Sequence, residues 1–148
     1  MVTVVIAAHG QLADALVHTA SMIFGTIEDV APVTFKPGEG VENLLDKYSA
    51  LIPDTKNDVL FLVDLLGGSP YNAASRFVAT KKNMDIVTGV NLPMLVEVLG
   101  TRMGGGDLHA MVSVAKKAGA DGIQAFHEWF DAQQIVNSEK AEEGDELG

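Results

Sequence analysis

The feature that most constrains this chain is the alternation of short apolar runs with stretches of helical periodicity. The first run, at residues 2–8, is apolar almost throughout, so the strand that it predicts must be covered on both faces. Apolar positions then recur at helical spacing from Leu12 to Ile23, and Gly25 ends the segment. This repeat predicts an α/β fold with a mostly parallel sheet between two helical layers, which is a three-layer, doubly wound arrangement.

The same alternation continues along most of the chain. Strands are expected at Val2–Ala8, Val30–Phe35, Val59–Asp64 and Met84–Val90. Helices are expected between and after these strands, at 12–24, 41–52, 70–79, 92–101 and 107–118. Residues 122–130 are expected to form a last strand or an irregular end, so we expect one domain at residues 1–130.

Composition narrows the possible functions. The chain has a formal net charge of −10 and no cysteine, which excludes disulfides, thiolate metal sites and a catalytic thiol. An acidic chain is poorly suited to bind nucleic acid, because phosphate contacts need lysine and arginine. No segment has the ~20 apolar residues of a membrane span and the N-terminal run lacks a basic start, so we expect a cytoplasmic protein. Residues 131–148 end in a cluster of acidic side chains and are expected to be a flexible tail.

Polar residues follow two of the apolar strands. His9 comes directly after the first strand, and Asp64 closes the third. Ligands of an open parallel sheet bind beyond the carboxyl ends of its strands, so we expect these two residues to meet there. A neutral imidazole is a good nucleophile, and a neighbouring carboxylate can fix its tautomer. Either residue can instead be structural, with His9 ending its strand and Asp64 capping backbone amides.

The segment Gly67-Gly68-Ser69-Pro70 leads from the third strand into a helix. Glycines let the backbone approach an anion, and a helix N-terminus offers free N–H groups and the positive end of a dipole. The segment is therefore a candidate phosphate cradle, although turn glycines before an N-cap serine would look the same. The remaining histidines, His18, His109 and His127, lack a partner at metal-site spacing, and no metal or cofactor is expected.

Four short segments occur in a specific order: VVIAAHG, PGE, VLFLVDLLGGSPYNAASR and GVNLPMLVE. Together they resemble the mannose-family enzyme IIA of the bacterial sugar phosphotransferase system, over roughly residues 1–127. The resemblance implies that His9 accepts a phosphoryl group from the phosphocarrier HPr and passes it to enzyme IIB. Enzyme IIB then phosphorylates the sugar that enters through the membrane permease components IIC and IID. The phosphoryl group is carried covalently on His9.

The resemblance also assigns the surrounding residues. Asp64 matches the supporting aspartate, and the phosphate-binding loop comprises Leu65, Leu66, Gly67, Gly68 and Ser69. Leu65 and Leu66 replace a hydroxyl and an indole found in some members, which removes side-chain donors but leaves backbone donors. We expect these leucines and Phe35 to exclude water and to form a docking patch for HPr.

The fold implied by the resemblance has a flavodoxin-like strand order. It ends in an antiparallel edge strand, here near Gly122–His127, which is exchanged between the subunits of a homodimer. This feature comes from the resemblance alone.

Other functions fit part of the pattern. A serine hydrolase could combine Ser69, His9 and Asp64, but a nucleophile elbow needs glycine at position 71, where this chain has Tyr71. IIA-like domains also serve as regulatory modules in transcription activators and as phosphoryl-donor subunits of dihydroxyacetone kinases. A flavin- or nucleotide-binding module is disfavoured, because basic residues are few and no P-loop is present.

Overall fold

Parallel strands form the sheet at the centre of the protein, whose computed structural model describes residues 1–147. The strands are β1 (Thr3–His9), β2 (Val30–Phe35), β3 (Val59–Val63) and β4 (Met84–Thr88). Their order is β2-β1-β3-β4, and every neighbouring pair is parallel. The parallel sheet is thus confirmed, and its order is that of the first four strands of the flavodoxin-like arrangement 2-1-3-4-5.

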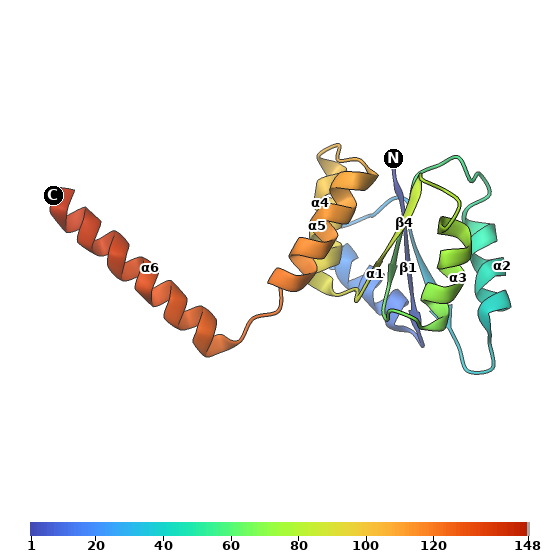
Figure 1. The fold of residues 1–148 in the computed structure, drawn as a ribbon, viewed down its shortest axis with the longest axis horizontal. Helices are drawn as coiled ribbons and strands as arrows, with labels where there is room; N and C mark the ends of the chain where they lie inside the picture. The colour runs from blue at the N-terminus through green and yellow to red at the C-terminus, as the bar shows by residue number, and fades with distance from the viewer. Residues whose placement is uncertain (148) are drawn as a thin grey trace.

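Helices cover both faces of the sheet, as Figure 1 shows. One face carries α1 (Leu12–Phe24), α4 (Leu92–Met103) and α5 (Leu108–Asp121). The other face carries α2 (Val41–Leu51) and α3 (Ser69–Val78). The three-layer arrangement expected from the strand–helix repeat is therefore present.

The apolar character of β1 follows from its central position. Val4, Ile6 and Ala8 pack toward α1, α4 and α5, whereas Val5 and Ala7 pack toward α2 and α3. All five side chains are fully buried. Because side chains of a strand alternate between its faces, a strand covered on both sides must be apolar at successive positions.

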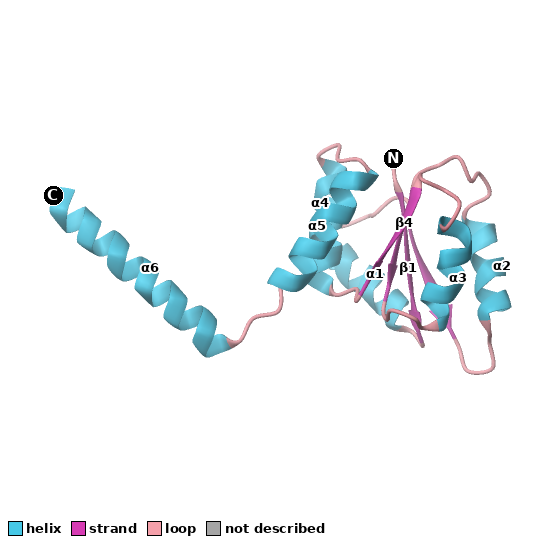
Figure 2. Cartoon of the chain, in the orientation of Figure 1, coloured by secondary structure: helices cyan, strands magenta, loops and turns pink. Residues whose placement is uncertain are grey.

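The connections of the sheet create a crevice at one end. From β1 the chain passes through α1 to β2, and from β2 it returns through α2 to β3 on the opposite side of β1. The loops that follow β1 and β3 therefore diverge at the carboxyl end of the sheet, where ligands of such folds bind (Figure 2). β3 ends at Val63, so Asp64 is the first residue beyond it, next to the end of β1.

The C-terminal segment differs from the expectation. Within residues 1–147 the sheet contains no antiparallel strand, and the segment expected as an edge strand, Gly122–His127, is a loop that enters α6 (Phe126–Leu147). A strand needs a neighbouring edge to pair with, and this segment reaches none in its own chain. The backbone instead forms helical hydrogen bonds, beginning with the Trp129 N–H to the Ala125 carbonyl at 3.0 Å.

Helix α6 extends away from the sheet and its covering helices (Figure 1). It contains residues 131–147 of the expected acidic tail, whose flexibility stays a prediction, and Gly148 lies outside the described residues. None of the helices in the described part of the chain combines the length and the apolarity that crossing a bilayer requires.

Candidate functional site

His9 and Asp64 meet at the carboxyl end of the sheet. They follow neighbouring parallel strands, which are paired up to Ala7 and Val63. The Asp64 Oδ2 atom lies 2.8 Å from His9 Nδ1 and accepts a second hydrogen bond, at 2.9 Å, from the His9 backbone N–H. The sequence-based expectation that these residues come together is confirmed.

The Asp64 carboxylate is held in its charged form. Burial raises the pKa of this carboxyl, but the hydrogen bonds from the His9 backbone and ring lower it by more, and the net pKa lies below the ordinary value. Its second oxygen, Oδ1, accepts the Leu65 N–H at 3.0 Å. The side chain is only 12% exposed, so these contacts hold it in one orientation.

This contact determines which nitrogen of His9 is free. A carboxylate only accepts hydrogen bonds, so Nδ1 of His9 must carry the proton. In the neutral ring Nε2 is then the unprotonated nitrogen, and it has no hydrogen-bond partner among the described residues. The His9 side chain is 46% exposed, so this nitrogen is accessible to an incoming group.

Two further contacts hold the ring of His9. The Phe35 ring packs edge-on against it, with ring centroids 5.4 Å apart and planes at 86°. Gly68 also lies beside the ring, and a Cβ atom at Gly68 would stand 3.0 Å from His9 Cε1. The loop that contains Gly68 is therefore directly beside the imidazole, and glycine is the residue that permits this approach.

The loop at residues 65–69 presents backbone N–H groups that have no acceptor among the described residues, but not all five of its residues do so. The N–H of Leu65 is bound to Asp64, and that of Gly68 faces the Leu65 carbonyl at 3.5 Å. The N–H groups of Leu66, Gly67 and Ser69 have no acceptor within residues 1–147. The Ser69 hydroxyl likewise makes no hydrogen bond to the described residues.

Local backbone preferences place these donors at the start of α3. Gly67 has φ of +82°, a left-handed conformation that favours glycine. Pro70 occupies the first turn, where its missing N–H costs nothing, and Gly68 is the N-cap without a side-chain hydrogen bond. Negative groups are favoured at such a helix start.

Asn72 and Glu39 support the site, although no pattern in the sequence indicates a role for them. Asn72 Nδ2 donates to the Gly67 carbonyl at 3.1 Å and so braces the loop. Glu39 Oε1 accepts from the Lys36 N–H at 2.7 Å and from Lys47 Nζ at 2.9 Å, which ties together the loop that follows Phe35. Both residues lie in the motifs that carry the resemblance, but only the fold shows what they contact.

The surface around the imidazole is apolar. Leu65 is 58% exposed and Leu66 is 74% exposed, and both follow directly on Asp64. Such exposure of adjacent leucines beside a polar site is typical of a surface that binds another molecule. Among the described residues no group of three or more His, Cys, Asp or Glu side chains is placed to hold a metal ion.

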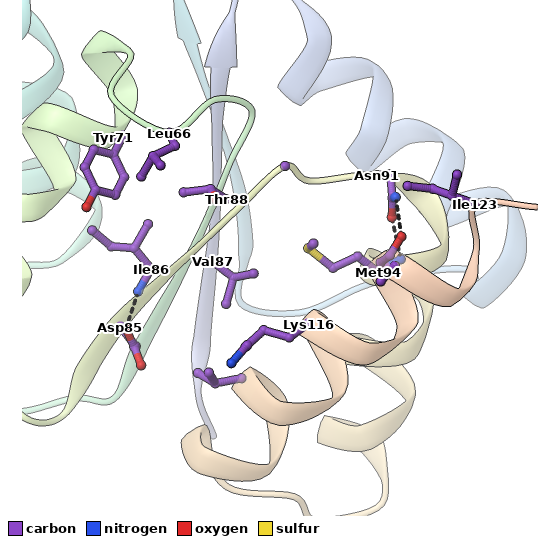
Figure 3. A pocket seen from close by; sticks show the side chains of 14 residues that line it. Leu66, Tyr71, Asp85, Ile86, Val87, Thr88, Asn91, Met94, Lys116 and Ile123 are labelled. Atoms are coloured by element: carbon purple, nitrogen blue, oxygen red, sulfur yellow. Dashed lines mark hydrogen bonds between the residues drawn. The ribbon is translucent and has the colours of Figure 1, made fainter.

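A cavity of about 670 Å³ lies beside this site, along the outer edge of β4 (Figure 3). Leu66 lines the cavity from the loop, Ile86 and Thr88 line it from β4, and Lys116 and Ile123 line it from α5 and the segment after it. The cavity therefore adjoins the phosphate-loop candidate without containing His9.

The chain is similar to known proteins of one family. The model of the EIIA-man family, described as the PTS system fructose IIA component, matches residues 3–116. The PTS system mannose-specific EIIAB component of Escherichia coli K12 is 44% identical over 127 residues, covering 84% of this chain and 39% of that protein. The PTS system fructose-specific EIIA component of Bacillus subtilis is 45% identical over 104 residues, covering 69% of this chain and 71% of that protein.

A solved structure shows the same fold. The crystal structure of the phosphotransferase system component EIIA from Streptococcus agalactiae matches with a TM-score of 0.80 and 27% identity. The match covers 86% of this chain and 99% of that one. The chain thus corresponds to nearly all of that EIIA structure, and to 39% of the longer mannose-specific relative.

Proposed function

The chain belongs to the mannose-type EIIA family of the phosphotransferase system, and from that premise we propose that it carries a phosphoryl group on Nε2 of His9. The observation that carries the proposal is the contact between His9 Nδ1 and Asp64 Oδ2 at 2.8 Å. It leaves Nε2 as the unprotonated, accessible nitrogen, which is the atom that a phosphorus centre can reach.

The transfer is an in-line displacement between two imidazoles. The lone pair of His9 Nε2 forms a bond to phosphorus while the N–P bond of the donor phosphohistidine breaks, and that electron pair returns to the donor nitrogen. The proton on Nδ1 stays between His9 and Asp64, whose negative charge offsets the positive charge that builds on the ring. Donor and acceptor groups are alike, so positioning and electrostatics are the main contributions of the protein.

The loop after Asp64 supplies those electrostatics. Phosphoryl oxygens on His9 would meet the free N–H groups of Leu66, Gly67 and Ser69, the Ser69 hydroxyl and the N-terminal end of α3. The expected contribution of the Leu65 and Gly68 N–H groups is smaller, since each already faces an oxygen of its own segment.

The partners follow from the family. We propose phospho-HPr as donor and enzyme IIB as acceptor, with the permease components IIC and IID acting further along the pathway and the whole cycle taking place in the cytoplasm. The exposed leucines, Leu65 and Leu66, together with Phe35, form the surface that both partners contact, and they shield the phosphoryl group from water. We expect no nucleic-acid partner, because the chain has a formal net charge of −10.

The test is phosphorylation by phosphoenolpyruvate, enzyme I and HPr, followed by intact-mass analysis. We expect the wild type to gain one acid-labile phosphate and His9→Ala to gain none. His18→Ala, a change of the same kind on α1, should behave as wild type. A wild type that stays unmodified while HPr is phosphorylated would contradict the proposal.

We also propose that the protein is a homodimer that exchanges the segment Gly122–His127 as an antiparallel edge strand. Two features support this arrangement: the outer edge of β4 is unpaired within the described residues, and the cavity of about 670 Å³ runs along it. A strand of a second copy would satisfy the free backbone groups of that edge. Light scattering should give twice the chain mass for wild type and for Ile135→Asp, whereas Ile123→Asp should give monomers.

A further inference from the structure

Tyr48 carries a buried hydroxyl that the mechanism above does not use. Its side chain, on α2, is fully buried and packs edge-on against Phe61 and Phe77, with ring centroids 5.1 and 6.0 Å away. Its hydroxyl donates to the Pro70 carbonyl at 2.9 Å. A phenylalanine would fill the same apolar space, so packing accounts for the ring but not for the hydroxyl.

The acceptor of this hydrogen bond lies in the first turn of α3. Pro70 is the residue after Ser69, and Ser69 contributes two of the free donors of the candidate phosphate loop. The N-cap, Gly68, has no side chain to hold the turn, and Pro70 has no N–H. Asn72 braces the loop from within the same segment, whereas Tyr48 joins the turn to a different helix.

The turn can shift only slightly before it disturbs the imidazole of His9. A Cβ atom at Gly68 would already approach His9 Cε1 to 3.0 Å, so the loop and the imidazole are in close contact. A displacement of the turn changes the distance between the Ser69 donors and a phosphoryl group on His9. A misplacement of about 1 Å can cost about a hundredfold in rate.

The hydroxyl remains a donor over the working pH range. Burial raises the pKa of the Tyr48 phenol, and the negative charge of Asp64 raises it further. Tyr48 therefore stays protonated, and its hydrogen bond to Pro70 persists while His9 gains and loses its group.

We propose that Tyr48 is a positioning residue for phosphoryl transfer: its hydroxyl holds the Pro70 carbonyl and thereby keeps the Ser69 donors in place beside His9. This inference rests on the proposed function. It distinguishes the hydroxyl, which acts on the transfer step through α3, from the ring, which stabilises the fold.

The experiment compares Tyr48→Phe with Tyr71→Phe. These are the only tyrosines in the sequence, and the Tyr71 hydroxyl, also on α3, makes no hydrogen bond within residues 1–147. Single-turnover transfer from phospho-HPr is measured against donor concentration, together with the thermal midpoint and the amide NMR shifts of Gly68 and Ser69. We expect Tyr48→Phe to lower the rate at saturating donor about three- to tenfold, as loss of one hydrogen bond implies, with an unchanged half-saturation concentration.

The control variant should match wild type in rate, and only Tyr48→Phe should shift the two amide signals. A Tyr48→Phe protein that transfers at the wild-type rate per folded molecule overturns the inference, even if its thermal midpoint falls. The proposed function then still stands, because wild type is phosphorylated in the same experiment. A wild type that takes up no phosphate contradicts the proposed function and overturns this inference with it.

Discussion

One oxygen of Asp64 accepts hydrogen bonds from both the backbone N–H and the ring Nδ1 of His9, at 2.9 and 2.8 Å. The carboxylate thus fixes the position of the strand end and the orientation of the ring with a single atom. Backbone placement and ring orientation at the site therefore depend on the same residue.

Asp64→Asn keeps the shape of this contact but removes the charge. We expect the rate of phosphoryl transfer to His9 to fall about ten- to a hundredfold, because a charge-assisted hydrogen bond is replaced by a neutral one. Stopped-flow or quenched transfer from phospho-HPr measures the rate. Asp58→Asn, at the opposite end of β3, is the matched control and should transfer normally. Equal rates for Asp64→Asn and wild type would rule out this role of the carboxylate.

The same carboxylate makes stability depend on pH. The pKa of Asp64 in the folded protein is below its ordinary value, because the hydrogen bonds from His9 outweigh the effect of burial. Its contribution to stability is therefore present above the unfolded value of about 4 and is lost as the pH falls through the folded pKa. Thermal unfolding of wild type and Asp64→Asn should give a constant difference in midpoint above about pH 5 that shrinks below about pH 4. A difference that stays constant through about pH 3 would disagree with this assignment.

Gly68→Ala tests the close approach of the loop to the ring. The new Cβ would stand 3.0 Å from His9 Cε1, so the ring or the loop must shift by a few tenths of an ångström. We expect transfer to slow several-fold, with little change in thermal midpoint. Gly40→Ala, at the N-cap of α2, places a Cβ in open space and is the control. A fully active Gly68→Ala protein would show that the site tolerates the shift.

Asn72→Ala removes the side-chain hydrogen bond to the Gly67 carbonyl. Gly67 is then free to leave its left-handed conformation, and we expect transfer to slow about three- to tenfold. Ser75→Ala, on the same helix, removes a hydroxyl that bonds only to the Asn72 carbonyl and should have no effect on transfer. The amide NMR shifts of Gly67 and Leu66 should change in Asn72→Ala alone, and unchanged shifts would argue against the bracing role.

Arg102 should affect stability without affecting transfer. Its guanidinium, on α4, donates to the carbonyls of Val2, Glu28 and Asp29 at the end of the sheet remote from His9. We expect Arg102→Met to lower the free energy of unfolding by about 1–3 kcal/mol, since three backbone carbonyls lose a charged donor. Lys117→Met removes an exposed pair with Asp121 and should leave the free energy of unfolding almost unchanged. Urea unfolding measures the free energy of unfolding of both variants. An altered transfer rate in Arg102→Met would contradict the expectation that Arg102 affects stability alone.

The sequence was sufficient to predict the strands, the layers and the meeting of His9 with Asp64. Each of these depends on local periodicity or on the rule that ligands bind beyond the carboxyl ends of parallel strands. The predicted edge strand at Gly122–His127 is not formed within the single chain, because a strand requires a partner that the local sequence does not specify.

The contacts that support the site could not be predicted either, because they join residues that only the folded chain brings together. Tyr48 contacts Pro70 across 22 positions of the sequence, and no local pattern indicates that these two residues pair. The loop after Asp64 was predicted as a whole, but the pairing of the Leu65 N–H with Asp64 depends on a side-chain orientation that only the folded chain fixes.

With Nδ1 of His9 engaged by Asp64, the imidazole has one open side, and the group must arrive and leave through the same opening. Two partners of protein size cannot occupy that opening together. Under the proposed function, the protein would therefore release its donor before it binds its acceptor, as in a ping-pong cycle. Under that proposal the donor and the acceptor would compete for one surface, so the exchange of one protein for the other would be a step of every transfer cycle.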